Sequence, residues 1–278
     1  MPKIFRQVKT TVPTQIFNDN SMPKVKLQHF ECQYQYDDFG HEETLVLSNS
    51  LGTNYSMWDE NVILLSQYFN ILRYDTRGHG KSTINQETVS VAELGNDVIE
   101  LLDYLKLDKV LFCGISMGGL IGQWLGIHHA ERFSKIILCN TAAKIGTADS
   151  WNSRIEQVKN NGLSSIIDGT ALRWFTIDYR EKHPEKVIQI LRDFEDTSLQ
   201  GYTACCTMVR DADFREQLHM LKVPVLIISG AKDEVTTVED GEFLQQQIPA
   251  AKHVVMEAAH LSNKANPEEF SKYIIHFT

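Results

Sequence analysis

The chain has 278 residues, of which 42% are hydrophobic and 23% are charged, a composition that excludes an intrinsically disordered protein and allows a large buried core. The formal net charge of −9 argues against nucleic acid or an anionic membrane as the partner. We see no signal peptide, no membrane-spanning apolar run and no CxxC spacing among the five cysteines, so we expect a cytoplasmic protein with free thiols.

Strands and helices are predicted to alternate along the chain from residue 25 onward. Residues 1–22 are polar and are expected to form an extension. Short apolar runs predict strands within residues 25–37 and at 44–48, 69–74, 110–113, 136–139, 225–229 and 253–256. Helical spacing of apolar residues predicts helices at 58–68, at 91–105, directly after 116, at 238–247 and from 266. This order is typical of an α/β protein with a mostly parallel sheet and helices on both faces.

The stretch from 142 to 221 interrupts the alternation. It has helical periodicity and contains no convincing strand. We therefore predict that a helical cap, residues 142–221, is inserted into an α/β core formed by residues 23–141 and 222–278. The adjacent Cys205 and Cys206 are expected to be packing residues of this cap.

Ser116 is the candidate nucleophile, because it stands in the GxSxG pattern GISMG. This pattern alone often occurs by chance, but here it follows the apolar run VLFC and precedes a helical pattern. A serine on such a sharp strand-to-helix turn needs small neighbours, so that its strained backbone can expose the hydroxyl. The N–H groups of the next helix point at the site, and we expect the Met117 N–H to be one oxyanion donor.

The nucleophile needs a histidine and an acid, which follow it in the order acid, then histidine in this fold class. Asp233 stands just beyond the strand VLIIS, where functional residues of α/β sheets collect, whereas Glu234 and Asp240 lie further along. His260 follows the predicted strand HVVM by a short loop, from which it can reach the serine. We predict that His260 accepts the serine proton and that Asp233 orients the ring. Four other histidines are expected to be core or surface residues, namely His128, His129, His253 and His276.

A second oxyanion donor is expected from the loop after the strand TLVLS, and we predict the Leu51 N–H. The run Gly80-Lys81-Ser82 is similar to the end of a phosphate-binding loop, but the glycine required five residues earlier is Asp75. Neither a metal-ligand spacing nor a dinucleotide fingerprint is visible. We therefore expect no metal and no organic cofactor.

With these motifs, the chain resembles the α/β-hydrolase superfamily from Val25 to Phe277. Its run YDTRGHGKS matches the Arg-Gly-His-Gly turn of that superfamily, which implies a scaffold role for Asp75, Arg77 and His79. Within the superfamily, LSNSLGTNYSMWD, GISMGGLIGQWLG, CNTAAKIG, WNSRIEQVKNNGL and RWFT are similar to the 3-oxoadipate enol-lactonases. The oxyanion loop begins with Asn49-Ser50, as in the enol-lactonases, instead of the usual His-Gly.

The resemblance implies a small anionic enol-lactone as substrate, opened by Ser116 through an acyl-enzyme to give 3-oxoadipate. Its carboxylate needs a local cation, and the cap residues Arg154 and Arg173 are the candidates, although either could be a solvated surface arginine. Candidates for lining the pocket, with core packing as the alternative, are Trp124, Trp151 and Trp174. Two other readings stay open. One is a carboxylesterase, carbon–carbon bond hydrolase or cofactor-free perhydrolase of this fold, and the other is a non-catalytic ligand-binding module.

Overall fold

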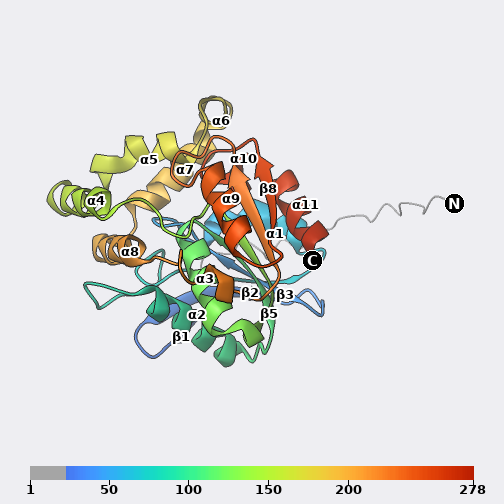
Figure 1. Ribbon diagram of the computed structural model, residues 1–278. Helices are drawn as coiled ribbons and strands as arrows, with labels where there is room; N and C mark the ends of the chain where they lie inside the picture. Colours follow the sequence, from blue (N-terminus) through green and yellow to red (C-terminus); the bar gives the residue numbers. More distant parts are fainter. Residues whose placement is uncertain (1–22) are drawn as a thin grey trace.

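The computed structural model describes residues 23–278, and the predicted extension, residues 1–22, lies outside them. At its centre is an eight-stranded sheet in the order β1-β2-β4-β3-β5-β6-β7-β8 (Figure 1). Strands β3 to β8 are mutually parallel, whereas β2 runs antiparallel to both β1 and β4. The mostly parallel α/β architecture is confirmed. The strands are β1 (Lys24–Lys26), β2 (Glu31–Asp37), β3 (Thr44–Ser48), β4 (Asn70–Tyr74), β5 (Val110–Ile115), β6 (Phe133–Cys139), β7 (Val225–Gly230) and β8 (Lys252–Met256).

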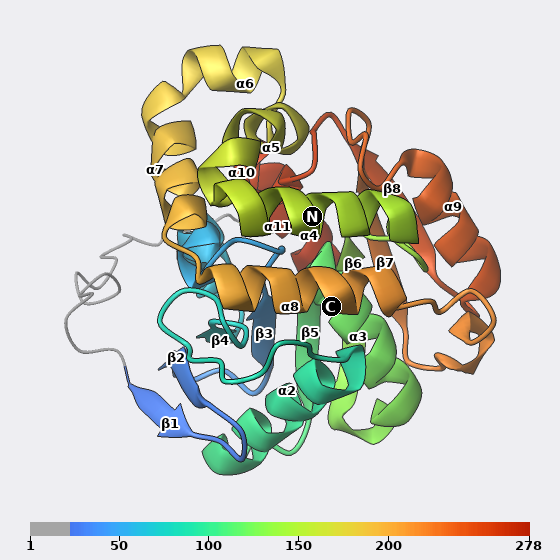
Figure 2. The ribbon, with the colours of Figure 1, turned by 90° about the vertical axis from the view of Figure 1, so that its left-hand side faces the viewer.

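Helices cover both faces of the sheet and bury its central strands. Every residue of β3, β4, β5 and β7 is buried, as expected for apolar strands in a parallel sheet. Helices α1 (Asp59–Leu65) and α11 (Pro267–Phe277) pack together on one face, and α2 (Val91–Leu105) and α3 (Met117–His128) on the other (Figures 1 and 2). Because the central strands are parallel, their carboxyl ends meet along one edge of the sheet.

Local sequence signals set the ends of α2. The Ser90 hydroxyl accepts a hydrogen bond from the Glu93 N–H at 3.2 Å, and the Glu93 carboxylate accepts one from the Ser90 N–H at 2.7 Å. Lys106 ends the helix in the left-handed conformation, with φ of 58°. The predicted helix at 91–105 is confirmed, and the face it buries contains Leu94, Val98, Leu101 and Leu102.

The chain between β6 and β7, where the cap is predicted, contains helices and loops but no strand. They cover the edge at which the carboxyl ends of the strands meet, and α4 packs against α8 (Figure 2). We call residues 148–211 the helical insertion; its status as a separate cap domain stays a prediction. Its α-helices are α4 (Ala148–Asn161), α5 (Ile167–Trp174), α6 (Ile177–Lys182), α7 (Pro184–Glu195) and α8 (Leu199–Asp211).

Close backbone contacts fasten the insertion to the rest of the chain. A Cβ atom on Gly78, in the turn after β4, would lie 2.4 Å from the Cα of Gly201 in α8, so only glycines allow this approach. At the other side, the His260 N–H donates to the carbonyl of Arg173 at 3.3 Å. The N–H of the next residue donates to the carbonyl of Trp174 at 3.2 Å. The insertion is thus bonded to the loop that carries the predicted catalytic histidine.

Candidate active site

Ser116 occupies the sharp turn between β5 and α3. Its φ of +56° lies in the left-handed region, which is strained for a residue other than glycine. A Cβ on Gly114 would lie 2.1 Å from the carbonyl oxygen of Gly118, and one on Gly118 would lie 2.5 Å from that of Ser48. The Ser116 N–H donates to the Cys139 carbonyl at 2.9 Å. The glycines of the motif are therefore a steric requirement of this turn.

Asp233 lies in the loop after β7 and accepts hydrogen bonds at both carboxylate oxygens. Its Oδ2 lies 2.8 Å from His260 Nδ1, 2.9 Å from Asn140 Nδ2 and 2.8 Å from Thr236 Oγ1. Its Oδ1 accepts from the N–H groups of Val235 and Thr236. Burial alone raises the pKa of Asp233, but the His260 ring and these donors outweigh it and lower the pKa to about 2. The group is therefore a carboxylate at neutral pH.

His260 lies between β8 and α10 (Ser262–Ala265), and its side chain is 3% exposed. Among the candidate histidines, all within residues 23–278, only His260 contacts Asp233. His253 Nε2 lies 2.9 Å from Ser229 Oγ, and His128 stacks on Trp124 with ring centroids 4.6 Å apart. The fold thus brings together the acid and the histidine that the sequence predicts for the triad.

Glu234 and Asp240, the alternative acids, form no hydrogen bond with His260. Glu234 is exposed and borders the cavity described below. Asp240 accepts from the Thr237 N–H at 2.8 Å, at the start of α9 (Val238–Gln247). Neither is paired with a histidine in the part of the chain that the structure describes.

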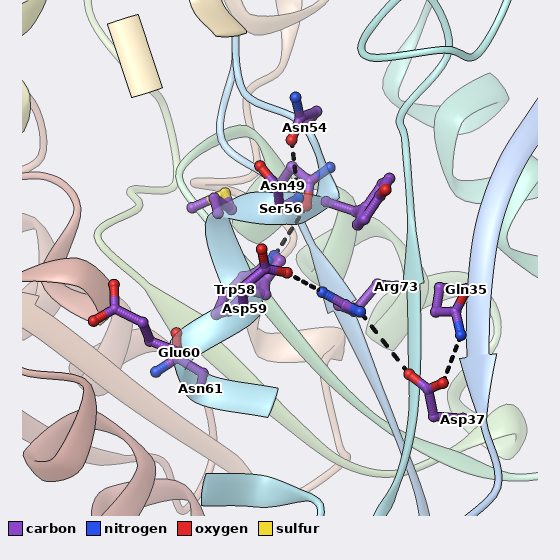
Figure 3. A network of polar contacts seen from close by, with 12 residues as sticks. Gln35, Asp37, Asn49, Asn54, Ser56, Trp58, Asp59, Glu60, Asn61 and Arg73 are labelled. Carbon is purple, nitrogen blue, oxygen red and sulfur yellow. Dashed lines mark hydrogen bonds and ion pairs between the residues drawn. The ribbon is translucent and has the colours of Figure 1, made fainter. Parts of the chain in front are cut away.

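The loop after β3 carries Leu51 and is hydrogen-bonded to the turn that carries Ser116. The Asn49 carbonyl accepts from the Gly118 N–H at 3.1 Å. The Asn49 side chain donates to the Tyr74 carbonyl in β4 at 2.9 Å. It accepts from the indole N–H of Trp58 at 2.9 Å (Figure 3). Within residues 23–278, the N–H groups of Leu51 and Met117 have no acceptor. Both are therefore available to an oxyanion.

The polar network around Asn49 extends to a buried arginine in β4 (Figure 3). The Arg73 guanidinium is fully buried, donates to Asp59 at the start of α1 and lies 3.9 Å from Asp37 Oδ2. Burial raises the pKa of Asp59, and the charge of Arg73 only partly offsets this effect. Asp59 directly follows Trp58, whose indole N–H contacts the predicted oxyanion loop, so this ion pair lies next to that contact in the chain.

A cavity of about 350 Å³ lies between the sheet edge and the insertion. Its wall on the sheet side includes Ser50, Leu51, Ser116 and His260. Its wall on the insertion side includes Trp151, Arg154, Arg173, Trp174, Phe194 and Tyr202. No hydrogen bond joins Ser116 Oγ to His260 within residues 23–278, and such bonds often tighten only around a substrate. A cavity lining that is mostly apolar, with a few convergent polar groups, is typical of a binding site for a small molecule.

Two arginines bring positive charge into this cavity. Arg154 Nη1 donates to the Tyr202 hydroxyl at 3.3 Å, and its guanidinium lies 5.3 Å from the centre of the Trp151 ring. Arg173 Nη2 donates to Thr170 Oγ1 at 3.2 Å. Burial and the charge of Arg154 lower the pKa of Arg173. No carboxylate within residues 23–278 forms an ion pair with either, so an anionic ligand would relieve their repulsion.

Comparison with known proteins decides the family. Residues 43–267 match the alpha/beta hydrolase fold family. The chain belongs to this family. It is 45% identical to 3-oxoadipate enol-lactonase 2 of Acinetobacter baylyi over 238 residues, which are 85% of this chain and 89% of that protein. It is also 45% identical to 3-oxoadipate enol-lactonase 1 of the same organism over 226 residues, 81% of this chain and 85% of that one.

A solved structure extends this similarity to the fold. The enol-lactonase from Burkholderia xenovorans LB400 matches this α/β hydrolase with a TM-score of 0.90 and 39% identity. The match covers 92% of this chain and 99% of that one. The resemblance drawn from the sequence motifs is confirmed.

One predicted pocket residue of the hydrolase lies elsewhere. Trp124 does not line the cavity; it stands on α3, where it stacks on His128 and packs against Gly95 of α2. A Cβ on Gly95 would lie 2.1 Å from the Trp124 ring. Trp124 therefore fills the contact between two helices, and the expectation for this residue is corrected. Trp151 and Trp174 do line the cavity.

The turn after β4 lies outside the cavity lining. Arg77 pairs with Asp97, and Asp75 accepts from the N–H groups of Tyr55 and Lys81. Burial raises the pKa of Asp75 to about 6 and lowers that of the fully buried His79 to about 4. These contacts are internal to the turn and its neighbours, and they agree with a scaffold.

Some residues that surround the site were not singled out from the sequence for this purpose. Asn140 directly follows β6, and its amide contacts Asp233. Trp58 was expected only as one apolar position of a helix, but its N–H holds Asn49. A polar residue directly after a buried strand is a signal that could have pointed to Asn140. Within residues 23–278 no group of three metal-ligating side chains converges, and no helix is long and apolar enough to cross a membrane.

Proposed function

We propose that this chain is a serine hydrolase that opens the ring of 3-oxoadipate enol-lactone to give 3-oxoadipate. The observation that carries the proposal is a single cavity lined by Ser116 and His260 on the sheet side and by Arg154 and Arg173 on the insertion side. Neither arginine has an ion-pair partner in the described residues. The relatives named 3-oxoadipate enol-lactonases, at 45% identity, support the same substrate. A cytoplasmic place in the β-ketoadipate pathway of aromatic catabolism is part of the proposal.

Acylation begins at the serine. His260 takes the hydroxyl proton of Ser116 while Oγ attacks the ring carbonyl carbon, and Asp233 stabilises the imidazolium that forms. The N–H groups of Leu51 and Met117 donate to the oxyanion of the tetrahedral intermediate. Its collapse breaks the bond between the carbonyl carbon and the ring oxygen. The oxygen leaves as an enolate, takes the proton from the imidazolium, and the enol then tautomerises to the ketone.

Deacylation repeats the sequence with water as the nucleophile. His260 takes a proton from the water, whose oxygen attacks the acyl carbon of the ester on Ser116. The second tetrahedral intermediate uses the same two N–H donors. Its collapse breaks the bond to the serine oxygen, which takes the proton back from His260, and the released carboxylic acid loses its remaining proton to solvent. The product therefore carries one more negative charge than the lactone.

In this proposal Arg154 and Arg173 bind the substrate carboxylate. The net charge of −9 repels an anionic substrate at long range, so attraction must come from cations at the site itself. A planar guanidinium can donate two parallel hydrogen bonds to the carboxymethyl group. We expect this contact to orient the ring with its carbonyl toward Ser116. The aromatic rings beside the arginines would hold the lactone by its apolar faces.

The same triad would also serve another small-substrate carboxylesterase, a carbon–carbon bond hydrolase or a cofactor-free perhydrolase. The unpaired arginines favour an anionic substrate over the neutral esters of a general esterase. A non-catalytic binding module would not need Asp233, whose five donors prepare a carboxylate to orient a base.

The deciding experiment follows the ultraviolet absorbance of freshly generated 3-oxoadipate enol-lactone with the native protein and with Ser116→Ala. We expect rapid loss with the native protein and none above background with the variant. Cleavage of p-nitrophenyl acetate without loss of the lactone would keep the triad and refute the substrate. No reaction with either compound or with a serine-directed fluorophosphonate would favour the binding module.

A further inference from the structure

Asn140 holds a strained backbone conformation at the centre of the site. Its φ is +43°, and its side chain is almost completely buried. In the described chain, it and Ser116 are the two non-glycine residues with positive φ at the carboxyl end of a strand. Asparagine tolerates the left-handed region better than most residues do, yet the conformation still has a cost. Such a residue persists where its surroundings hold it in place.

The carboxamide of Asn140 joins the acid loop to the histidine loop. Its Nδ2 donates to Asp233 Oδ2 at 2.9 Å and to the carbonyl of Ala259 at 3.3 Å. Its Oδ1 accepts from the Ser262 hydroxyl at 2.5 Å. The serine therefore fixes which way the amide faces, with the amino group toward the acid. One side chain therefore contacts Asp233 and two residues of the loop that carries His260, namely Ala259 and Ser262.

The backbone around this amide is closely packed. A Cβ on Gly230, the last residue of β7, would lie 3.0 Å from Asn140 Nδ2 and 2.7 Å from the Ala259 carbonyl. The next residue, Thr141, donates from its hydroxyl to the Ser116 carbonyl at 2.9 Å. The two residues after β6 thus contact the loops of all three predicted triad members.

We propose that Asn140 is a positioning residue, whose amide fixes the Asp233 oxygen that faces His260 and ties the histidine loop to the same point. This inference rests on the proposed serine hydrolase function. Around Asp233 Oδ2, the donors of Asn140 and Thr236 occupy two directions and leave the third to the imidazole. The titratable groups that meet here are Asp233 and His260, with Glu234 at the cavity rim.

The test compares Asn140→Asp, Asn140→Gly and Ser262→Ala with the native chain on p-nitrophenyl acetate. We expect kcat to fall about tenfold or more in both Asn140 variants, with KM nearly unchanged, because proton transfer is misaligned. In Asn140→Asp, the acid limb of the kcat/KM profile moves up by about one pH unit, since a second carboxylate favours the protonated imidazole. Glycine tolerates the positive φ at this position and adds no charge, so the acid limb of the Asn140→Gly profile should move less.

Ser262→Ala keeps the Asn140 backbone and the amide and removes only the group that orients it. We expect a smaller loss of kcat, about fivefold. The matched control is Asn70→Ala, which removes a buried amide at the start of β4, away from the site. It should lower the melting temperature and leave kcat and the pH profile unchanged.

Variants that are folded and keep both the native kcat and the native acid limb would overturn the positioning role. A melting temperature lowered in Asn140→Gly as in Asn70→Ala, with kinetics intact, would assign Asn140 to folding alone. Failure of the native chain to cleave either the ester or the lactone would instead refute the proposed function. The two failures are therefore distinguishable.

Discussion

Replacing Arg173 with glutamine removes a positive charge from the cavity and keeps the backbone carbonyl that accepts from the His260 N–H. In the proposed complex this guanidinium faces the substrate carboxylate. Two unit charges about 4 Å apart attract by about 4 kcal/mol at an effective dielectric constant of about 20. Arg173 is half-buried, and screening by solvent reduces the gain to about 2 kcal/mol, as in a charge-assisted hydrogen bond. We therefore expect kcat/KM to fall roughly thirtyfold.

The assay measures kcat and KM for 3-oxoadipate enol-lactone and for an uncharged enol-lactone in which a methyl group replaces the carboxymethyl arm. The loss should appear mainly in KM and only with the charged substrate, because the contact is made in both the ground state and the transition state. Arg210→Gln is the control, since Arg210 lies in α8, pairs with Asp211 and does not line the cavity. Equal losses on both substrates, or an equal effect of Arg210→Gln, would refute the reasoning.

Three further predictions concern the scaffold. Trp58→Phe leaves the buried Asn49 oxygen without its donor, so we expect the unfolding free energy to fall by about 1–3 kcal/mol in a urea titration. A boronic acid that mimics the oxyanion should also bind more weakly in a ligand titration, because the loop that carries Leu51 is less well held. Gly118→Ala forces a Cβ to within 2.5 Å of the Ser48 carbonyl, and fluorophosphonate labelling of the folded variant should be abolished. The folded chain binds a proton at His79 only near pH 4, whereas the unfolded chain binds it near 6.5. As the pH falls from about 6.5 to about 4, the unfolding free energy of the native protein should therefore fall by about 3 kcal/mol more than that of His79→Gln, measured by urea unfolding.

The contact between Asp233 and His260 could be predicted because each of the three proposed triad residues follows a strand. In a parallel sheet the carboxyl ends of the strands share one edge, so these residues were expected near one another without knowledge of the side-chain packing. Arg154 and Arg173 were candidates because the resemblance implied a substrate carboxylate that needs a cation, and both line the cavity. Their spacing in the sequence did not predict this, because the insertion folds back over the sheet.

What the sequence did not predict has two physical causes. Trp124 comes eight residues after Ser116, and at 1.5 Å per residue α3 carries it about 12 Å from the turn. The bond from Trp58 to Asn49 and the bond from Asn140 to Asp233 join residues from different elements. Such contacts depend on side-chain direction across the sheet edge, which no local pattern encodes.

The two backbone bonds from His260 and its neighbour to α5 limit how this enzyme can be engineered. Donors and acceptors in these bonds are main-chain groups, so a point substitution cannot tune them. A chimera that receives a foreign segment for residues 142–221 would exchange the carbonyl bonded to the His260 N–H together with the two arginines proposed to bind the substrate. Recombination at these boundaries therefore changes specificity and turnover at once, and laboratory evolution that seeks new substrates should leave the main chain at 173–174 intact.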